Sequence, residues 1–414
     1  MGYVGWIDSF EGKKNDPRQG KYESEMVREL RELGAVLYVK TSVPHTLMSG
    51  ETVNNIIEYT YNPKNRYLSS GGSSGGEGAL IGLKGSPVGL GTDIGGSIRI
   101  PAAFNGLYGI RPSHGRMPYE GMANSMDGQN SVLSVVGPIG TTSAAVKLVF
   151  KSLLSQQPWL HDPNVIEIPW RQDVEDEVKN NAKQLSFGLF ATDGMVNPQP
   201  PVARAIKMVA EALEKAGNKV LPWDSPEHHE GMSTTVTSWG YDGGKDIFDA
   251  FALSGEEPAP QIGVFYGKEP KPAKDASHIA QNNVAHRQWK KKYMDYWNST
   301  ASQTGSGKPI DAIITPVCVY AAARPQKFKY YTYSAFINGL DYTSVVVPVT
   351  IADKRVDTYP SDYKPISDAD KECMQDYDAE IYDGAHVAIQ LVGRRLQEEK
   401  MLAIAEYVGG LLGR

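Results

Sequence analysis

The feature that most constrains the fold of this chain is the glycine-rich segment 71–101, which reads GGSSGGEGALIGLKGSPVGLGTDIGGSIRIP. Eleven of the 26 residues from Gly71 to Gly96 are glycine, and apolar residues that belong in a core are interspersed among them. Glycines among core residues predict a buried backbone that adopts conformations forbidden to side chains, or one that a ligand approaches closely. Two glycine turns carry serines, Ser73 and Ser74 in the first and Ser97 in the second. The segment therefore predicts a nucleophilic hydroxyl beside exposed backbone amides.

Ser97 is the candidate nucleophile of this segment. The backbone N–H groups that precede and include it can converge on one oxygen atom: Ile94, Gly95, Gly96 and Ser97. Such donors stabilise the oxyanion of an acyl-transfer intermediate, and a single donor contributes about 3–4 kcal/mol. The alternative reading is a serine that only ends a turn. Asp93 and Arg99 flank the same turn, and we expect them to form a structural ion pair that braces it rather than to act in catalysis.

The two turns resemble the amidase signature family, serine hydrolases that cleave amides with a Ser–cis-Ser–Lys triad. Residues 71–79 and 91–101 match the two halves of that signature at its spacing. Four further segments look like the fungal general amidase and acetamidase branch, namely 111–112, 115–118, 158–171 and 390–395. Fatty acid amide hydrolases are similar over the signature itself. The resemblance implies an α/β/α fold, a mixed sheet covered by helices, in which residues 1–414 form a single domain without the family's N-terminal portion.

The resemblance also implies a role for each candidate residue. Ser97 would form the acyl-enzyme while the amides of residues 94–97 hold the carbonyl oxygen. Ser73 would sit on a cis peptide bond and relay the proton of Ser97. Ser74 would support this pair by hydrogen bonding, and Leu47 would border the substrate. The expected reaction is hydrolysis of a small-molecule carboxamide to a carboxylate and an amine, and it uses no metal or cofactor.

The third member of the family's triad is a lysine, which the resemblance places upstream of Met1, because residues 2–6 look like the segment that follows it. We therefore expect this chain to lack that lysine and to be nearly inactive. A replacement base would need to reach Ser73 and have its pKa lowered by burial. The lysines considered for this role are Lys13, Lys14, Lys40, Lys64 and Lys84. None of them lies in a sequence context that suggests such a base, and Lys40 is the least unsuitable.

Two alternatives remain open at this point. Residues 72–76 also fit G-x-S-x-G, the nucleophile elbow of α/β-hydrolases, with Ser74 as the nucleophile and His386 as the candidate base. That motif requires a strand just before the serine, and the polar segment 62–70 is a poor strand. The other alternative is a catalytically silent amidase-like protein that binds amide ligands, or a fragment of a longer enzyme.

Composition excludes several classes of function. A net charge of −6 argues against nucleic-acid binding, because no basic surface would neutralise phosphates. Two cysteines are too few for a disulfide framework and indicate a reducing compartment. No apolar run approaches the roughly 20 residues of a membrane span, and the N-terminus lacks a signal peptide pattern. We expect a cytoplasmic protein whose partners are a small amide and, in the case of self-association, a second copy in a homodimer.

Hydrophobic periodicity predicts alternating helices and strands, which is typical of an α/β sheet. Helices are expected over 22–33, 76–83, 142–154, 202–216, 284–299 and 397–412. Strands are expected over 35–40, 106–110, 185–191, 219–222, 312–315, 345–349 and 387–392. Residues 224–283 read as a polar surface excursion. Trp289, Tyr293 and Trp297 form an aromatic stripe typical of a core. Tyr330, Tyr331 and Phe336 hint at an apolar or aromatic acyl group in the substrate.

Overall fold

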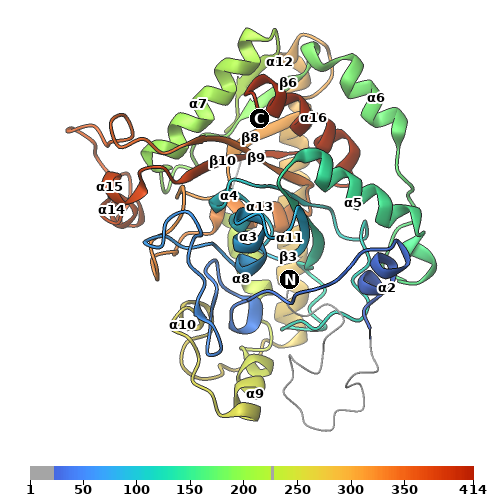
Figure 1. Cartoon of the computed structure of the whole chain (residues 1–414), viewed down its shortest axis with the longest axis vertical. Helices are drawn as coiled ribbons and strands as arrows, with labels where there is room; N and C mark the ends of the chain where they lie inside the picture. The colour runs from blue at the N-terminus through green and yellow to red at the C-terminus, as the bar shows by residue number, and fades with distance from the viewer. Residues whose placement is uncertain (1–22, 225–227) are drawn as a thin grey trace.

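The structure is a computed structural model that describes residues 23–224 and 228–414. The strands of its main sheet are β3 (Val88–Asp93), β4 (Tyr108–Arg111), β5 (Val135–Gly140), β6 (Ser186–Leu189), β7 (Lys219–Pro222), β8 (Ala312–Pro316), β9 (Ser344–Ile351) and β10 (His386–Val392). They form an eight-stranded sheet in the order β3-β5-β4-β9-β10-β8-β6-β7 (Figure 1). Neighbours from β3 to β8 are antiparallel, whereas β6 pairs in parallel with β8 and β7. The predicted mixed sheet is confirmed.

Helices cover both faces of this sheet. The main helices are α2 (Glu25–Glu32), α3 (Gly75–Gly82), α4 (Arg99–Phe104), α5 (Ser143–Ser155), α6 (Gln172–Asn180), α7 (Pro200–Lys215), α8 (His228–Ser238), α9 (Lys245–Ser254), α10 (Ile262–Tyr266), α11 (Ala276–Ser299), α13 (Thr332–Leu340) and α16 (Glu398–Leu411). Helix α16 packs against α5, α6 and α7 in one group of helices, α3 packs against α4, and α8 packs against α11 and α13 (Figure 1). The expected α/β/α arrangement is confirmed.

Shorter elements complete the described chain. They are a hairpin of β1 (Val53–Asn54) and β2 (Glu58–Tyr59), the helices α12 (Ala301–Thr304), α14 (Asp368–Gln375) and α15 (Ala379–Tyr382), and the 3₁₀ turns η1 (His45–Leu47), η2 (Pro158–Leu160) and η3 (Ala182–Gln184). Among the described helices, none is both long enough and apolar enough to cross a membrane.

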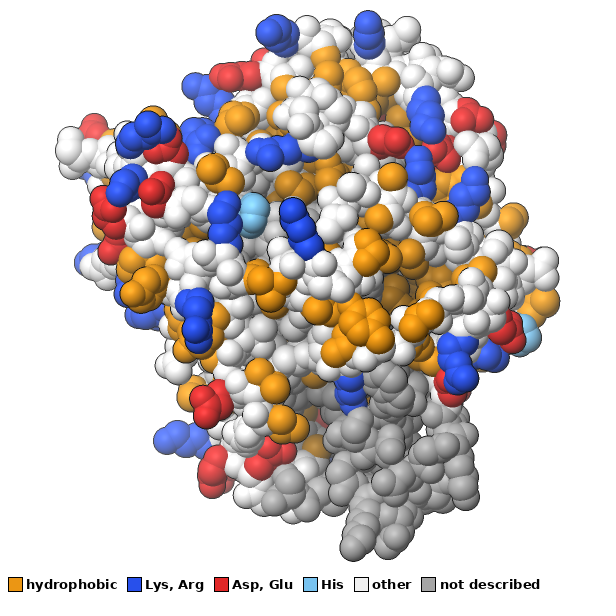
Figure 2. Space-filling model, in the orientation of Figure 1, with side chains coloured by type: hydrophobic (Ala, Val, Ile, Leu, Met, Phe, Trp, Pro, Cys, Tyr) orange, Lys and Arg blue, Asp and Glu red, His pale blue; other side chains and the backbone are white. Residues whose placement is uncertain are grey.

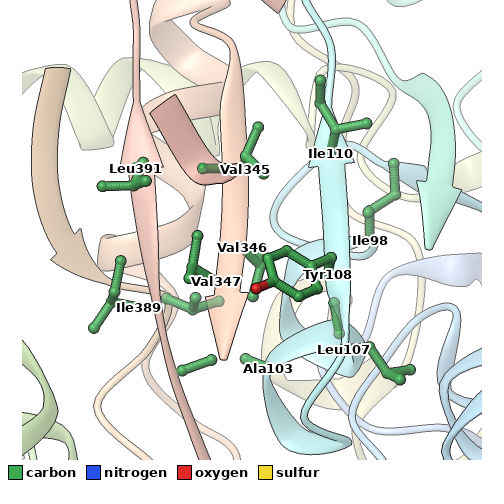
Figure 3. Packing of buried hydrophobic residues seen from close by; sticks show 14 of the residues in the cluster. Ile98, Ala103, Leu107, Tyr108, Ile110, Val345, Val346, Val347, Ile389 and Leu391 are labelled. Atoms are coloured by element: carbon green, nitrogen blue, oxygen red, sulfur yellow. The ribbon is translucent and has the colours of Figure 1, made fainter. Parts of the chain in front are cut away.

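The second glycine turn is anchored to the centre of the sheet by the residues that follow it. Figure 3 shows Ile98 and Ala103, at the start and near the end of α4, packed beside the apolar side chains of β4, β9 and β10. Ile98 and Val346 are fully buried in this cluster. Burying such side chains contributes about 1.5–3 kcal/mol each, so the turn before α4 is anchored to the buried centre of the sheet.

Several predicted elements are confirmed with small shifts at their ends. Helix α2 ends before Gly34, which adopts a φ of 83°. Helix α5 begins after Thr142, whose hydroxyl accepts a hydrogen bond from the Ala145 N–H at 3.1 Å, the pattern of an N-cap. Strand β7 coincides with the predicted 219–222. The aromatic stripe of α11 is core, with Tyr293 fully buried.

The predicted strand over 35–40 is wrong. Within the described residues this segment forms no strand and runs along the surface, where Val36 is 83% and Tyr38 61% exposed. The strand was predicted because the segment is apolar, but no neighbouring strand among the described residues pairs with it. Figure 2 shows hydrophobic side chains gathered on the face that the chain after α2 crosses in Figure 1.

The predicted polar excursion over 224–283 is also wrong, because it contains α8, α9, α10 and the first part of α11. Helix α8 packs against both α11 and α13. Its polar side chains are buried because they donate to carbonyls of their own helix: the Thr234 hydroxyl bonds to the Gly231 carbonyl at 2.7 Å, and the Ser238 hydroxyl to the Thr234 carbonyl at 3.0 Å. Hydroxyls satisfied within a helix can be buried, so polarity alone did not indicate a surface segment.

Helix α16 is tied to the chain after β4 by a buried ion network. The Arg116 guanidinium donates to Glu398 at 2.9 Å and to Glu399 at 2.7 Å, and all three side chains are 0% exposed. Removing one partner of a buried ion pair leaves the others uncompensated, which is far more costly than losing a surface pair.

We therefore expect Arg116→Met to lower the free energy of unfolding by about 3–5 kcal/mol. The matched control is Arg355→Met, because Arg355 is 82% exposed in its pair with Asp353, and the loss of such a surface pair should leave the free energy of unfolding nearly unchanged. Urea unfolding followed by circular dichroism measures both. Equal losses in the two variants would contradict the structural role of the buried network.

Candidate active site

The two glycine turns meet at the start of two helices. The Ser74 N–H donates to the Ser97 carbonyl at 3.2 Å, and the Ser74 hydroxyl accepts from the Thr92 N–H at 3.3 Å. The peptide bond between Gly72 and Ser73 is cis, as the resemblance implies. Ser73 and Ser74 are 1% exposed and Ser97 is 8% exposed. The structure therefore brings all three predicted serines into one buried junction.

Glycine is required where other backbone approaches these turns. A Cβ atom on Gly76 would lie 2.2 Å from the backbone nitrogen of Ser42, so the segment that leads to η1 could not approach the first turn. Gly96 has a φ of 129°, and a Cβ there would lie 2.6 Å from the side chain of Ser334. Both positions explain why the signature is rich in glycine.

A fully buried ion pair braces the second turn. The Arg99 Nε and Nη2 atoms each donate to the Asp93 carboxylate at 3.0 Å, and both side chains are 0% exposed. Burial alone would raise the pKa of Asp93, but the Arg99 charge outweighs it and holds the pKa of that carboxyl below its ordinary value. The predicted structural pairing of Asp93 with Arg99 is confirmed.

The brace extends from the turn to α13 and β10. Arg99 donates to Asn338 Oδ1 at 2.7 Å and to Gln390 Oε1 at 2.9 Å. The Asn338 amide donates to the Asp93 carboxylate at 2.8 Å. The Ser334 hydroxyl donates to the Gly95 carbonyl at 2.6 Å. Sequence analysis did not assign these α13 side chains to the site, because they lie more than 200 residues from the turn in the sequence and meet it only in the folded structure.

The four amides of residues 94–97 are not equivalent. The Gly96 N–H donates to the Asp93 carboxylate at 2.8 Å, so the expectation that it faces the substrate oxygen is wrong. Within residues 23–224 and 228–414, the N–H groups of Ile94, Gly95 and Ser97 donate to no protein group. Three amides therefore remain available for an oxygen atom at this turn.

The hydroxyls of Ser73 and Ser97 are not hydrogen-bonded to each other, and neither has a bonded lysine within the described part of the chain. Leu47 lies in η1 and is 8% exposed, and the adjacent Met48 packs in the same apolar cluster as Ile94. The chain just after Leu47 lies against the first glycine turn, where a Cβ atom on Gly72 would be 2.6 Å from the Ser49 carbonyl oxygen.

The lysines lie as follows. Lys13 and Lys14 are outside the described residues, as is the segment 2–6. Lys40 lines a cavity of about 1070 Å³ beside the segment that leads to η1. Lys84 follows the far end of α3, which at about 1.5 Å per residue places it more than 10 Å along the helix from Ser74.

The nucleophile-elbow alternative, with Ser74 as nucleophile and His386 as base, does not fit the structure. His386 lies near Lys64. Burial and the positive charges of Lys64 and Arg414 lower the pKa of His386 to about 4. His386 packs against Gly106 rather than Ser74. Within residues 23–224, no strand directly precedes Ser74. The nucleophile-elbow alternative is therefore wrong.

Trp239 is a further residue that the sequence did not indicate. Its ring lies 3.1 Å from the position of a Cβ on Gly95, and the side chain is 3% exposed. It also lines a cavity of about 950 Å³, and neither this cavity nor the larger one is lined by Ser73 or Ser97. Phe336, expected near the acyl group, is instead fully buried in the core.

Two of the tyrosines proposed to face an acyl group also have protein partners. The Tyr330 hydroxyl donates to the Asp193 carboxylate. The Tyr331 hydroxyl accepts a hydrogen bond from the Gly50 N–H at 2.8 Å. Tyr331 thus holds the segment after η1 rather than standing free toward a ligand.

Comparison with known proteins agrees with this geometry. The amidase family matches residues 13–402 of the chain. Acetamidases of Aspergillus oryzae and Emericella nidulans are 47% and 45% identical over 100% of this chain, which spans 74% of each relative. The structure of a fatty acid amide hydrolase is similar with a TM-score of 0.88 at 30% identity, covering 100% of this chain and 72% of that one. The matched sequence and the shared fold together show that the chain belongs to the amidase family of enzymes.

Proposed function

We propose that this chain hydrolyses carboxamides through an acyl-enzyme on Ser97. The observation that supports the proposal most directly is the set of free amides at Ile94, Gly95 and Ser97 beside that hydroxyl. Backbone donors at the nucleophile are the requirement of acyl transfer, because they stabilise the charge that develops on the carbonyl oxygen.

In the proposed reaction, the Ser97 oxygen attacks the carbonyl carbon of the amide and gives up its proton. Ser73 accepts that proton and passes its own to a base; the family resemblance assigns that role to a lysine, and within residues 23–224 and 228–414 no lysine is bonded to Ser73. The tetrahedral intermediate collapses as the C–N bond breaks, and the leaving amine takes the proton. A water molecule then attacks the acyl-enzyme by the same path and releases the carboxylate and the Ser97 hydroxyl.

We propose a short aliphatic amide of the acetamide type as the substrate. The names of the two acetamidase relatives support this class. The indole of Trp239 against Gly95 supports it too, because it leaves little room for a bulky acyl group on that side of the turn. The free, buried thiols of Cys318 and Cys373 support work in a reducing compartment such as the cytoplasm. The second candidate is a silent member that binds amides, favoured by the absence of a lysine bonded to Ser73 among the described residues.

The nucleophile assignment predicts that Ser97→Ala abolishes both acetamide hydrolysis and labelling by a fluorophosphonate probe. Loss of a nucleophile in such a unit costs on the order of 10⁴–10⁶ in kcat. Ammonia release and mass spectrometry of the labelled peptide measure the two effects. Ser70→Ala is the matched control. The buried Ser70 hydroxyl donates to the Gly75 carbonyl at 2.8 Å, and this bond does not involve the second turn. Labelling of Ser74, or activity that survives in Ser97→Ala, would refute the assignment.

The brace predicts a pH dependence of stability. Because the pKa of Asp93 is lowered in the fold, its charged form stabilises the protein above the unfolded pKa of about 3.9, and this contribution is lost as the pH falls through the folded pKa. Asp93→Asn should therefore lose about 3–5 kcal/mol of unfolding free energy at pH 7. The difference between the two proteins should shrink below about pH 4. Urea titrations from pH 3 to pH 8 test this, and a difference that stays constant over the range would contradict it.

A further inference from the structure

The carbonyl groups of the second glycine turn are held by side chains of α13. The Asp93 carbonyl accepts a hydrogen bond from the Asn338 amide at 3.2 Å. The Gly95 carbonyl accepts one from the Ser334 hydroxyl at 2.6 Å. Ser334 and Asn338 are four residues apart on α13, so they lie one turn apart on the same face of the helix. One face of one helix therefore holds two peptide groups of the turn.

A held carbonyl fixes the direction of the N–H in the same peptide group, because the two point in opposite directions across a planar trans peptide. The N–H in the peptide of the Asp93 carbonyl belongs to Ile94, so the bond from Asn338 turns the Ile94 N–H away from α13. The same relation applies at Ser97, since the Gly96 carbonyl accepts from the α4 backbone at 2.7 Å. Among the described residues neither of these N–H groups has an acceptor, so both can donate to a ligand.

The peptide between Gly95 and Gly96 is the weak point of the turn. Two adjacent glycines allow a peptide group to rotate at little steric cost. Here it is held at both ends, because the Gly95 carbonyl accepts from Ser334 and the Gly96 N–H donates to Asp93 at 2.8 Å. The two adjoining peptides carry the N–H groups of Gly95 and Ser97, so rotation of this peptide would misdirect two of the donors that must point at one oxygen atom in the transition state.

We infer that Ser334 and Asn338 are positioning residues of the oxyanion hole, and that the Ser334 hydroxyl locks the Gly95–Gly96 peptide against this rotation. The inference rests on the proposed function, since it assigns a catalytic consequence to the turn of Ser97. The Ser334 hydroxyl has one proton and lies 3.0 Å from the Tyr331 carbonyl as well. It donates to the Gly95 carbonyl because that oxygen is nearer.

The structure offers a matched control for this lock. The Ser344 hydroxyl donates to Gln390 Oε1 at 3.0 Å, and Gln390 also accepts from Arg99. Ser334 and Ser344 are both 0% exposed. Ser344→Ala thus removes a buried hydroxyl from the same network without touching the turn, and any loss of stability common to both variants reports the network alone.

The test compares Ser334→Ala with Ser344→Ala in the full chain. We expect similar falls in melting temperature, but only Ser334→Ala should lower kcat for acetamide, by roughly 10-fold to 1,000-fold as for a lost oxyanion donor, with KM nearly unchanged. Phenylboronic acid, which forms a tetrahedral adduct with a serine hydroxyl, should lose affinity for Ser334→Ala by a similar factor in calorimetry. Ser334→Cys, which fills the space with a weaker donor, should fall between the two proteins.

Each outcome decides one claim. Equal kcat and equal boronate affinity in Ser334→Ala and Ser344→Ala would overturn the inferred role of Ser334. If Ser97→Ala is inactive in the same assay, the assignment of Ser97 as the nucleophile still holds. If the unaltered protein does not bind phenylboronic acid, both the preformed oxyanion hole and the positioning role of Ser334 are refuted. If Ser334→Ala does not fold, Ser334→Cys decides, and a value equal to that of the unaltered protein would overturn the inference.

Discussion

The fully buried pair of Asp93 and Arg99 is the interaction on which the rest of the site depends. A charge without water must be matched by charges and hydrogen bonds, and here the matching groups come from the turn itself, from α13 and from β10. Each of them is thereby tied to the residues around Ser97. Such a pair adds little net stability over an apolar core, so its value lies in the geometry that it imposes on the turn.

The elements closest to the site were the most predictable from sequence. The glycine turns, the serines and the pairing of Asp93 with Arg99 all lie within one short segment, and their spacing carries the information. Helices with strong periodicity, such as α5 and α7, were also predictable, because one apolar face must be buried.

The remainder was not predictable, for identifiable physical reasons. Helix α8 buries hydroxyls that are satisfied by its own carbonyls, so its polar sequence resembles that of a surface loop. The segment 35–40 is apolar without a strand beside it. The Gly96 N–H donates to a carboxylate only three positions away, and three-dimensional packing decides between that bond and a free donor. Ser334 and Asn338 act across a distance in sequence that no local pattern bridges.

The position of Trp239 separates two tasks within the molecule. The hydrogen bonds of the brace come from α4, α13 and β10, whereas Trp239, which lies directly after α8, touches Gly95 by van der Waals contact alone and belongs to the apolar cluster of α9, α10 and α11. Substitutions in that cluster can therefore change the packing against Gly95 while every hydrogen bond of the turn is kept. A chain built in this way can diversify the amides it accepts while its reaction chemistry stays fixed.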